Sequence, residues 1–130
     1  MVTSLHDIPG NHYDQIPFAA VAAGTATNYV AAWYVPFAAQ VQRVLLLFTD
    51  AITGQNTHTC HFNLDDTDQS TELGNTDFVA STNAVAGTEI AIYGTAKSMA
   101  AGQNLYLERE LVGNGLASPE GVMVVEYRGV

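Results

Sequence analysis

The sequence predicts an all-β protein, an antiparallel β-sandwich or barrel that follows an N-terminal extended arm. Short segments with the β-branched and aromatic composition of strands alternate with clusters of turn-forming residues at nearly regular spacing. No internal repeat of about 20–50 residues is present, which argues against solenoids and propellers. The length of 130 residues and the hydrophobic content of 48% suit one domain with a core of its own.

Residues 1–24 are expected to form the arm, and residues 25–130 the sandwich domain. The run Ile8-Pro9-Gly10-Asn11 is a turn signal, and Ile16-Pro17 imposes a second extended step. Residues 18–23 offer at most two helical turns, which are too few for a helix that forms in isolation. We therefore expect this segment to lie on a surface, either of its own domain or of a neighbouring molecule.

The first three strands are expected at residues 27–35, 41–49 and 58–64. The second contains Val44–Phe48, a continuous apolar run that is typical of a strand covered on both faces. The third alternates, with Cys60, Phe62 and Leu64 on its apolar side. Cys60 is the single cysteine, so it cannot form an intramolecular disulfide, and on the apolar side its thiol is expected to be inert.

Four further strands are expected at residues 77–81, 89–93, 104–112 and 122–128, with a polar, acidic loop at residues 65–75. Helix competes with strand at residues 105–111, which contain Glu and Arg, and at residues 96–101, which could form one turn. We expect a strand at the first of these, because Tyr106 and the glycine-rich neighbours favour extended backbone.

The charge balance argues against two classes of partner. Four Lys and Arg residues against thirteen Asp and Glu residues give a formal net charge of −9, which repels phosphate groups. No nucleic-acid or membrane partner is therefore expected. The first residues lack a basic start and an apolar run, and Val44–Phe48 is far shorter than the roughly 20 residues of a membrane helix, so no secretory signal or membrane span is expected.

Metal and cofactor chemistry has few candidates, and no cofactor is expected. His58 and His61 stand three residues apart on an expected strand, which places them on opposite faces rather than around one ion. A calcium site in the acidic loop is the alternative to a solvated loop, although the EF-hand pattern is missing. The carboxylates of that alternative site are Asp65, Asp66 and Asp68.

Aromatic residues offer a second alternative, a carbohydrate-stacking platform formed by Tyr29, Trp33 and Tyr34. At strand spacing, Tyr29 and Trp33 fall on one face and Tyr34 on the other. Packing in a core or at a subunit interface is the commoner role of such residues.

The sequence contains few cations and several stretches of small neutral residues expected at the surface, such as 19–23, 84–86 and 96–101. A free monomer usually mixes charges of both signs on its exterior. A neutral surface with an extended arm is typical of a subunit in a tightly packed assembly. This pattern predicts a structural role.

Two parts of the sequence carry a resemblance. Ala32-Trp33-Tyr34-Val35-Pro36-Phe37 leads into an apolar strand, and Tyr106-Leu107-Glu108-Arg109-Glu110 is joined through Gly113-Asn114-Gly115 to residues 122–127. In this layout, over about residues 25–130, the chain resembles the jelly-roll decoration (cement) proteins and head fibres of tailed bacteriophages.

The resemblance implies a β-sandwich of jelly-roll type that forms homotrimers on the capsid exterior and carries no catalytic residues. Such a protein is made in the host cytoplasm and stabilises the virion by bridging subunits of the major capsid protein. The arm residues expected to contact the shell are Ile8, Tyr13, Ile16, Pro17 and Phe18. The residues expected at the subunit interface are Trp33, Tyr34 and Phe37.

Two other functions are weighed against this one. A carbohydrate- or receptor-binding module of a phage fibre would use the aromatic platform and, with calcium, the acidic loop. A jelly-roll metalloenzyme of cupin type would need an HxH pair and a later histidine, but the sequence has no HxH and no histidine after His61. The ligand pattern therefore argues against the enzyme.

Overall fold

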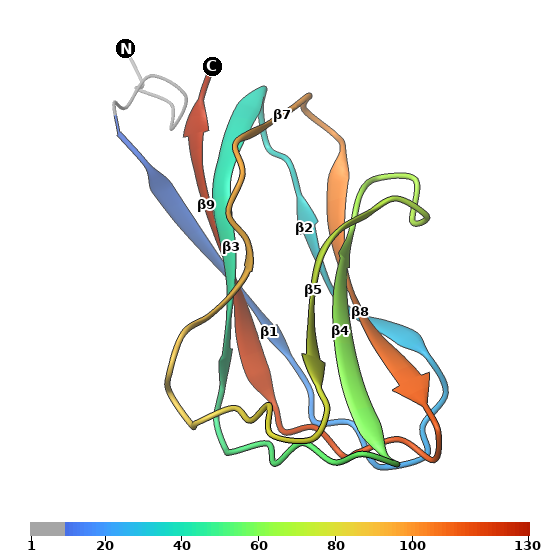
Figure 1. Ribbon diagram of the computed structural model, residues 1–130. Helices are drawn as coiled ribbons and strands as arrows, with labels where there is room; N and C mark the ends of the chain where they lie inside the picture. The colour runs from blue at the N-terminus through green and yellow to red at the C-terminus, as the bar shows by residue number, and fades with distance from the viewer. Residues whose placement is uncertain (1–9) are drawn as a thin grey trace.

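The computed structural model describes residues 10–130, which form nine strands in two antiparallel sheets (Figure 1). The first sheet has the order β1 (His12–Phe18), β9 (Gly121–Gly129), β3 (Ala39–Phe48) and β6 (Ile90–Tyr93), and β7 (Lys97–Met99) pairs with the first residues of β3. The second sheet has the order β2 (Asn28–Tyr34), β8 (Asn104–Val112), β4 (Thr59–Asp65) and β5 (Glu72–Phe78). The all-β sandwich predicted from the sequence is confirmed.

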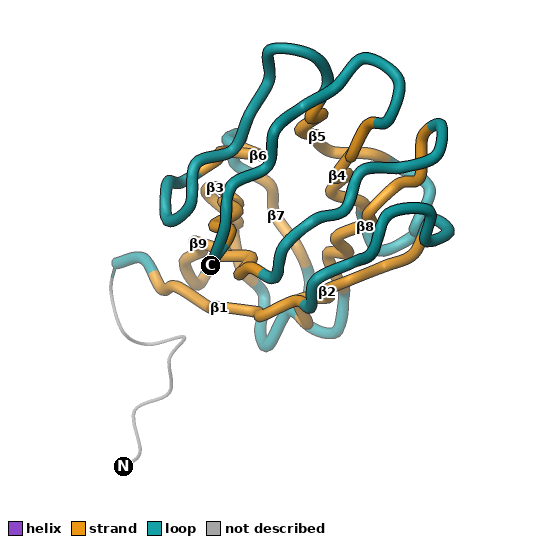
Figure 2. Tube along the Cα trace, turned by 90° about the horizontal axis from the view of Figure 1, so that it is seen from below, coloured by secondary structure: helices purple, strands orange, loops and turns teal. Residues whose placement is uncertain are grey.

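The chain crosses from one sheet to the other at most connections, which gives the orders 1-9-3-6 and 2-8-4-5. Eight strands connected in this way form a jelly roll, and β7 is an addition to it. Seen from below, β9, β3 and β6 lie apart from β8, β4 and β5, while β1 and β2 lie next to each other along one side (Figure 2). On the opposite side β5 contacts β6.

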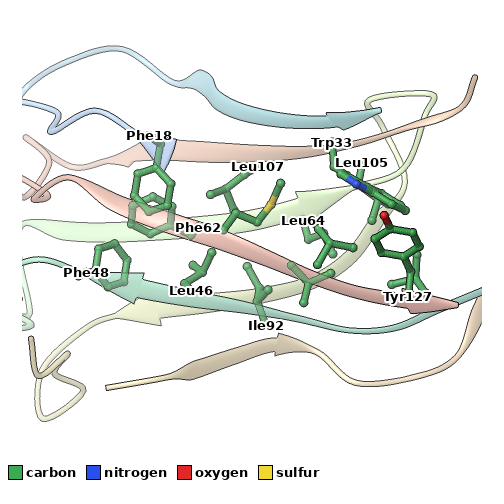
Figure 3. Close-up of a cluster of buried hydrophobic side chains, with 14 of the residues drawn as sticks. Phe18, Trp33, Leu46, Phe48, Phe62, Leu64, Ile92, Leu105, Leu107 and Tyr127 are labelled. Carbon is green, nitrogen blue, oxygen red and sulfur yellow. The ribbon is translucent and has the colours of Figure 1, made fainter. Parts of the chain in front are cut away.

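The core between the sheets is aromatic at both ends and aliphatic in the middle. Phe18, Phe48 and Phe62 pack at one end, with ring centroids 5.3–5.9 Å apart. Trp33 and Tyr127 lie at the other end, 5.0 Å apart, and Figure 3 shows Leu46, Leu64, Leu107 and Ile92 between the two groups. All of these side chains except Phe18, which was expected in the arm, come from segments predicted to be strands, and they meet because every second residue of a strand faces the same side.

Strand β5 differs from the prediction. It covers residues 72–78, so most of it lies within the segment expected to be an acidic loop, and only residues 66–71 connect it to β4. Strand β5 is at the edge of its sheet and turns mainly Leu73 and Phe78 toward the core. An edge strand with so few inward apolar residues lacks the alternation by which sequence reasoning recognises strands.

None of the three possible helices, at residues 18–23, 96–101 and 105–111, forms, and residues 105–111 belong to strand β8 as expected. No residue from 10 to 130 lies in a helix that could span a membrane. Residues 97–99 are strand β7, which continues the sheet along Ala39–Val41 beyond the end of β6. In residues 18–23, Phe18 ends β1, and the backbone of Val21 exchanges two hydrogen bonds of 2.9 Å with Ser118. Strand pairing satisfies the backbone groups that a short helix would have left exposed.

The expected arm is wrong for residues 12–18, which form β1, the outer strand of the first sheet, paired with β9 along its whole length. Alternate residues of β1 face the interior and end with the buried Phe18. An edge strand tolerates Pro17 because it needs ladder hydrogen bonds on one side only. The sandwich therefore begins before the predicted boundary at residue 25.

The register of β2 also differs from simple alternation. A bulge between Tyr29 and Ala31 shifts the strand against β8, so Tyr29 lies opposite Glu108 and Trp33 opposite the inward Leu105. Trp33 is 3% exposed, whereas Tyr29 is 38% exposed. The prediction that these two rings share a face is therefore wrong, because a bulge adds one residue and reverses the sides that follow.

Candidate functional site

The structure separates the residues expected at the subunit interface. Trp33 is buried in the core, and its Nε1 donates a hydrogen bond of 2.7 Å to Asp14 Oδ2. Phe37 is half-buried and packs edge-on against His12, with 6.4 Å between ring centroids. Tyr34 alone is widely exposed, at 65%. Trp33 is therefore unavailable to a partner, and the three residues do not form one surface patch.

The residues expected to contact a shell are divided between the two sides of β1. Tyr13 and Pro17 are exposed on the outer side, whereas Ile16 and Phe18 face the interior. Ile8 lies outside the described residues. Alternation along a strand explains the division, since residues 13 and 17 share one side and residues 16 and 18 share the other.

The carboxylates of the expected calcium site have separate partners. Asp65 accepts a hydrogen bond from the Tyr29 hydroxyl, and Asp66 pairs with Lys97 at 2.9 Å. Asp68 accepts three hydrogen bonds, from the Thr71 hydroxyl and from the backbone N–H groups of Ser70 and Thr71, which hold its pKa well below the usual range. Among residues 10–130, no group of three or more His, Cys, Asp and Glu side chains is placed to hold a metal ion.

The structure separates the single cysteine, Cys60, from solvent and places His58 and His61 apart from each other on the chain's fold. Cys60 is fully buried, and burial raises the pKa of its thiol, in agreement with the expectation that it is unreactive. His61 lies on the outer side of β4, with Nδ1 3.2 Å from Asp77 Oδ1, and His58 precedes the strand. The two histidines therefore do not share one strand face.

A groove of about 360 Å³ opens beside the start of β2. It is lined by residues 19–22, Thr25, Asn28, Tyr29 and Val30. Its lining contains one ionisable side chain, Tyr29, so it holds no pair of groups for acid–base chemistry.

The outer side of the β2–β8–β4–β5 sheet is strongly acidic. Asn63 donates hydrogen bonds to Glu108 and Glu110, at 3.2 and 3.0 Å. Burial raises the pKa of the Asp65 carboxyl, and the charge of Glu108 raises it further. We call this surface the acidic face, and its carboxylates belong to Asp65, Glu72, Asp77, Glu108 and Glu110.

The outer side of the β1–β9–β3–β6 sheet has an apolar centre. Leu45 lies opposite Val124, and Leu47 lies opposite Val122. Leu45 and Val124 are 5% and 8% exposed, yet neither belongs to the core cluster between the sheets. These four residues, Leu45, Leu47, Val122 and Val124, are called the apolar face below.

The four Lys and Arg residues all lie within residues 10–130, and each of them has a partner there. Arg43 pairs with Glu126, and Lys97 pairs with Asp66. Arg128 donates two hydrogen bonds to Gln40 Oε1, and the fully buried Arg109 donates to the backbone carbonyls of Thr25 and Leu116. None of these contacts involves a carboxylate of the acidic face, which carries five of the thirteen Asp and Glu residues.

The sequence signals for the two faces differ in clarity. The outward residues of β4 and β8 are polar at alternate positions, which any strand analysis identifies. Leu45 and Leu47 of the apolar face lie in the uninterrupted run Val44–Phe48, interpreted above as a strand covered on both faces, but the run alone does not say which residues of β9 lie beside them.

No known protein family, curated protein or solved structure matches this chain.

Proposed function

We propose that this chain is a structural virion protein that decorates the exterior of a viral capsid and stabilises it by bridging shell subunits as a homotrimer. The phage decoration proteins that the sequence resembles are built on jelly rolls. The proposal is supported most directly by the contrast between its two outer faces. One carries five carboxylates, and the other presents Leu45, Leu47, Val122 and Val124 with its charges paired.

A subunit with two unlike faces suits a position on the outside of a shell. The acidic face would remain hydrated, whereas an apolar face lowers the free energy of the system when a neighbouring molecule covers it. A protein that binds only assembled shells shifts the assembly equilibrium toward them, by about 2.7 kcal/mol at a hundredfold excess over the dissociation constant. Threefold symmetry would use each contact three times.

The decisive experiment is binding to shells assembled from the major capsid protein of the same virus. We expect the chain to sediment with shells, to be found in purified virions in a fixed ratio to the shell protein, and to raise the temperature at which shells break. The Tyr13→Ala variant, which changes a side chain that is 56% exposed, should bind more weakly. The control is Val85→Ala, whose side chain is 65% exposed away from the strands. Failure of the folded protein to bind assembled shells would contradict the proposal.

A truncation of residues 1–24 would be a poor test of whether the N-terminal segment contacts the shell. It would remove β1 and with it Phe18 from the core, so a loss of binding would report on unfolding. A point change at Tyr13 keeps the backbone of β1 and alters only its outer side.

The second candidate function is a carbohydrate- or receptor-binding module of a fibre. Tyr29 and Tyr106 favour it, because their rings lie 5.4 Å apart beside Asp65 and so combine aromatic surface with a hydrogen-bond acceptor. This candidate predicts binding to a glycan array that the Tyr106→Ala variant loses. Binding to glycans without binding to shells would favour it over capsid decoration.

A further inference from the structure

We propose that Asn114 is a site of spontaneous deamidation and that the isoaspartate formed there loosens the connection between β8 and β9. The inference concerns a chemical modification of the chain and stands independently of the proposed function. Asn114 is the one asparagine of the sequence that precedes a glycine, Gly115. Asparagine is among the thermolabile residues of proteins, and the residue that follows it supplies the attacking atom.

The reaction needs only hydroxide ion and water as co-reactants. Hydroxide removes the proton of the Gly115 backbone N–H, and the nitrogen attacks Cγ of the Asn114 side chain. The new N–C bond closes a succinimide ring, and the side-chain nitrogen takes a proton from water and leaves as ammonia. Water then opens the ring at either carbonyl carbon, which gives aspartate or isoaspartate. Glycine favours ring closure because it has no Cβ atom to crowd the nitrogen and its backbone is the most flexible.

The structure leaves the Asn114 side chain open to this reaction. Asn114 lies in the turn that follows β8, it is exposed, and its amide group has no hydrogen-bond partner among residues 10–130. Water and hydroxide therefore reach its Cγ atom. Asn83 shows the contrast, since its Oδ1 accepts a hydrogen bond of 3.0 Å from the Gly54 N–H and its next residue is Ala84.

The attacking nitrogen is held back while the turn is closed. The Gly115 N–H donates to the Val112 carbonyl oxygen at 3.1 Å, so the turn must open before the nitrogen can reach the Asn114 side chain. An exposed turn opens locally at a much lower free energy than the whole sandwich. We therefore expect the reaction to proceed in the folded chain, but more slowly than in the unfolded chain.

The packing around Gly115 explains why the product should loosen the loop. Gly115 is buried, and a Cβ atom built on it would lie 2.5 Å from Leu111 Cδ1 and 3.2 Å from the Gly24 nitrogen. Isoaspartate lengthens the main chain by one carbon atom directly before this tightly packed position. The carbonyl oxygen of the next residue, Leu116, accepts a hydrogen bond from the buried Arg109 guanidinium. The added atom displaces these contacts, which tie the loop to β8.

The test incubates the full chain at neutral and alkaline pH and follows deamidation by peptide mass spectrometry. Trypsin cuts after Arg109 and Arg128, and the peptide of residues 110–128 contains Asn114 as its one asparagine. We expect this peptide to gain the mass difference between a hydroxyl and an amino group. The gain should be faster at alkaline pH, because hydroxide starts the reaction, and faster in urea than in the folded chain.

The internal control is Asn56, which is also exposed in a loop but precedes the β-branched Thr57. Its peptide should keep its mass while Asn114 is converted. The Asn114→Gln variant should also keep the mass of the 110–128 peptide, because a glutamine side chain would have to close a larger ring. Absence of the mass gain in the wild type, or an equal rate at Asn56, would overturn the assignment of the site.

A second measurement tests the effect of the product on the fold. Chromatography of the 110–128 peptide separates the isoaspartate form from the aspartate form, and urea denaturation compares aged with fresh protein. The aged wild type should unfold at lower urea concentrations. Fresh Asn114→Asp, which has the new charge on an unaltered main chain, should unfold as the fresh wild type does. Isoaspartate without a loss of stability would overturn the proposed loosening, and so would an equal loss in Asn114→Asp.

Discussion

The Asp14 carboxylate on β1 accepts a hydrogen bond from the Trp33 indole on β2, with 2.7 Å between Oδ2 and Nε1. The two strands belong to different sheets, so this contact joins the sheets along the side of the sandwich where β1 and β2 meet. Asp14 also accepts from the Tyr127 hydroxyl at 3.2 Å. Burial, together with the Asp14 charge, raises the pKa of Tyr127 to about 12.

Replacement of Asp14 by alanine should destabilise the fold. The change leaves the Trp33 indole N–H without its acceptor, and hydrogen bonds to charged groups contribute about 1.5–3 kcal/mol. Urea denaturation should show a loss of that size for Asp14→Ala and little change for Gln15→Ala, which alters the exposed neighbour on the outer side. Equal losses for the two variants would contradict a special role for Asp14.

Replacement of Arg109 by alanine should lower the free energy of unfolding. Its fully buried guanidinium donates to the carbonyls of Thr25 and Leu116, which ties two loops to β8. Arg109→Ala removes both donors and leaves a cavity, so we expect a loss of about 2–4 kcal/mol in the free energy of unfolding. The control is Arg128→Ala, whose side chain is exposed, and it should change stability by no more than about 0.5 kcal/mol in the same denaturation experiment.

Glu126 should make stability depend on pH in the acid range. Hydrogen bonds from Arg43, above all, and from Asn11 and Tyr13 lower the pKa of its carboxyl from the ordinary value of 4.5. A carboxyl with a lowered folded-state pKa stabilises the native state above its unfolded-state pKa, and this contribution is lost as the pH falls through the folded-state pKa. Denaturation midpoints from pH 7 to pH 3 should therefore fall less steeply in Glu126→Gln than in the wild type. Identical slopes would contradict this assignment.

Gly74 should tolerate no side chain. A Cβ atom built there would lie 2.0 Å from the backbone carbonyl oxygen of Ile92, where β5 meets β6 at the side of the sandwich. Gly74→Ala should cost about 1–3 kcal/mol because the backbone must move. Gly94→Ala is the matched control, since no atom lies within 4 Å of its Cβ position, and thermal unfolding compares the two. An unchanged melting temperature for Gly74→Ala would show that the two strands can separate without cost.

Most of the strands could be predicted from the sequence, and the three exceptions, β1, β5 and β7, share a feature. Each pairs with a single neighbouring strand, so it needs only one row of backbone partners and few inward apolar residues. Pro17 in β1 and Gly74 in β5 weaken the local strand signal further. Long-range pairing, rather than local preference, places these strands in the sheets.

The candidate surfaces were predictable to a lesser degree. The acidity of the chain is evident from its composition, but the gathering of Glu108, Glu110 and Asp65 on one face depends on which strands are neighbours. The platform expected from Tyr29 and Trp33 failed because one bulge residue turned the two rings to opposite sides. Residue spacing along a strand does not reveal a bulge, since the bulge forms only when the strand pairs with its neighbour.

The sequence by itself determined the all-β class, the inert cysteine, the excess of negative charge and the apolar run in β3, because each follows from residue types or from spacing along one segment. Only the tertiary structure decided that β1 belongs to the sandwich, that Trp33 is a core residue and that Leu45 and Val124 meet on an outer surface. Those features arise from contacts between segments far apart in the chain, and the free energy of such contacts depends on a register and a strand order that no single segment contains.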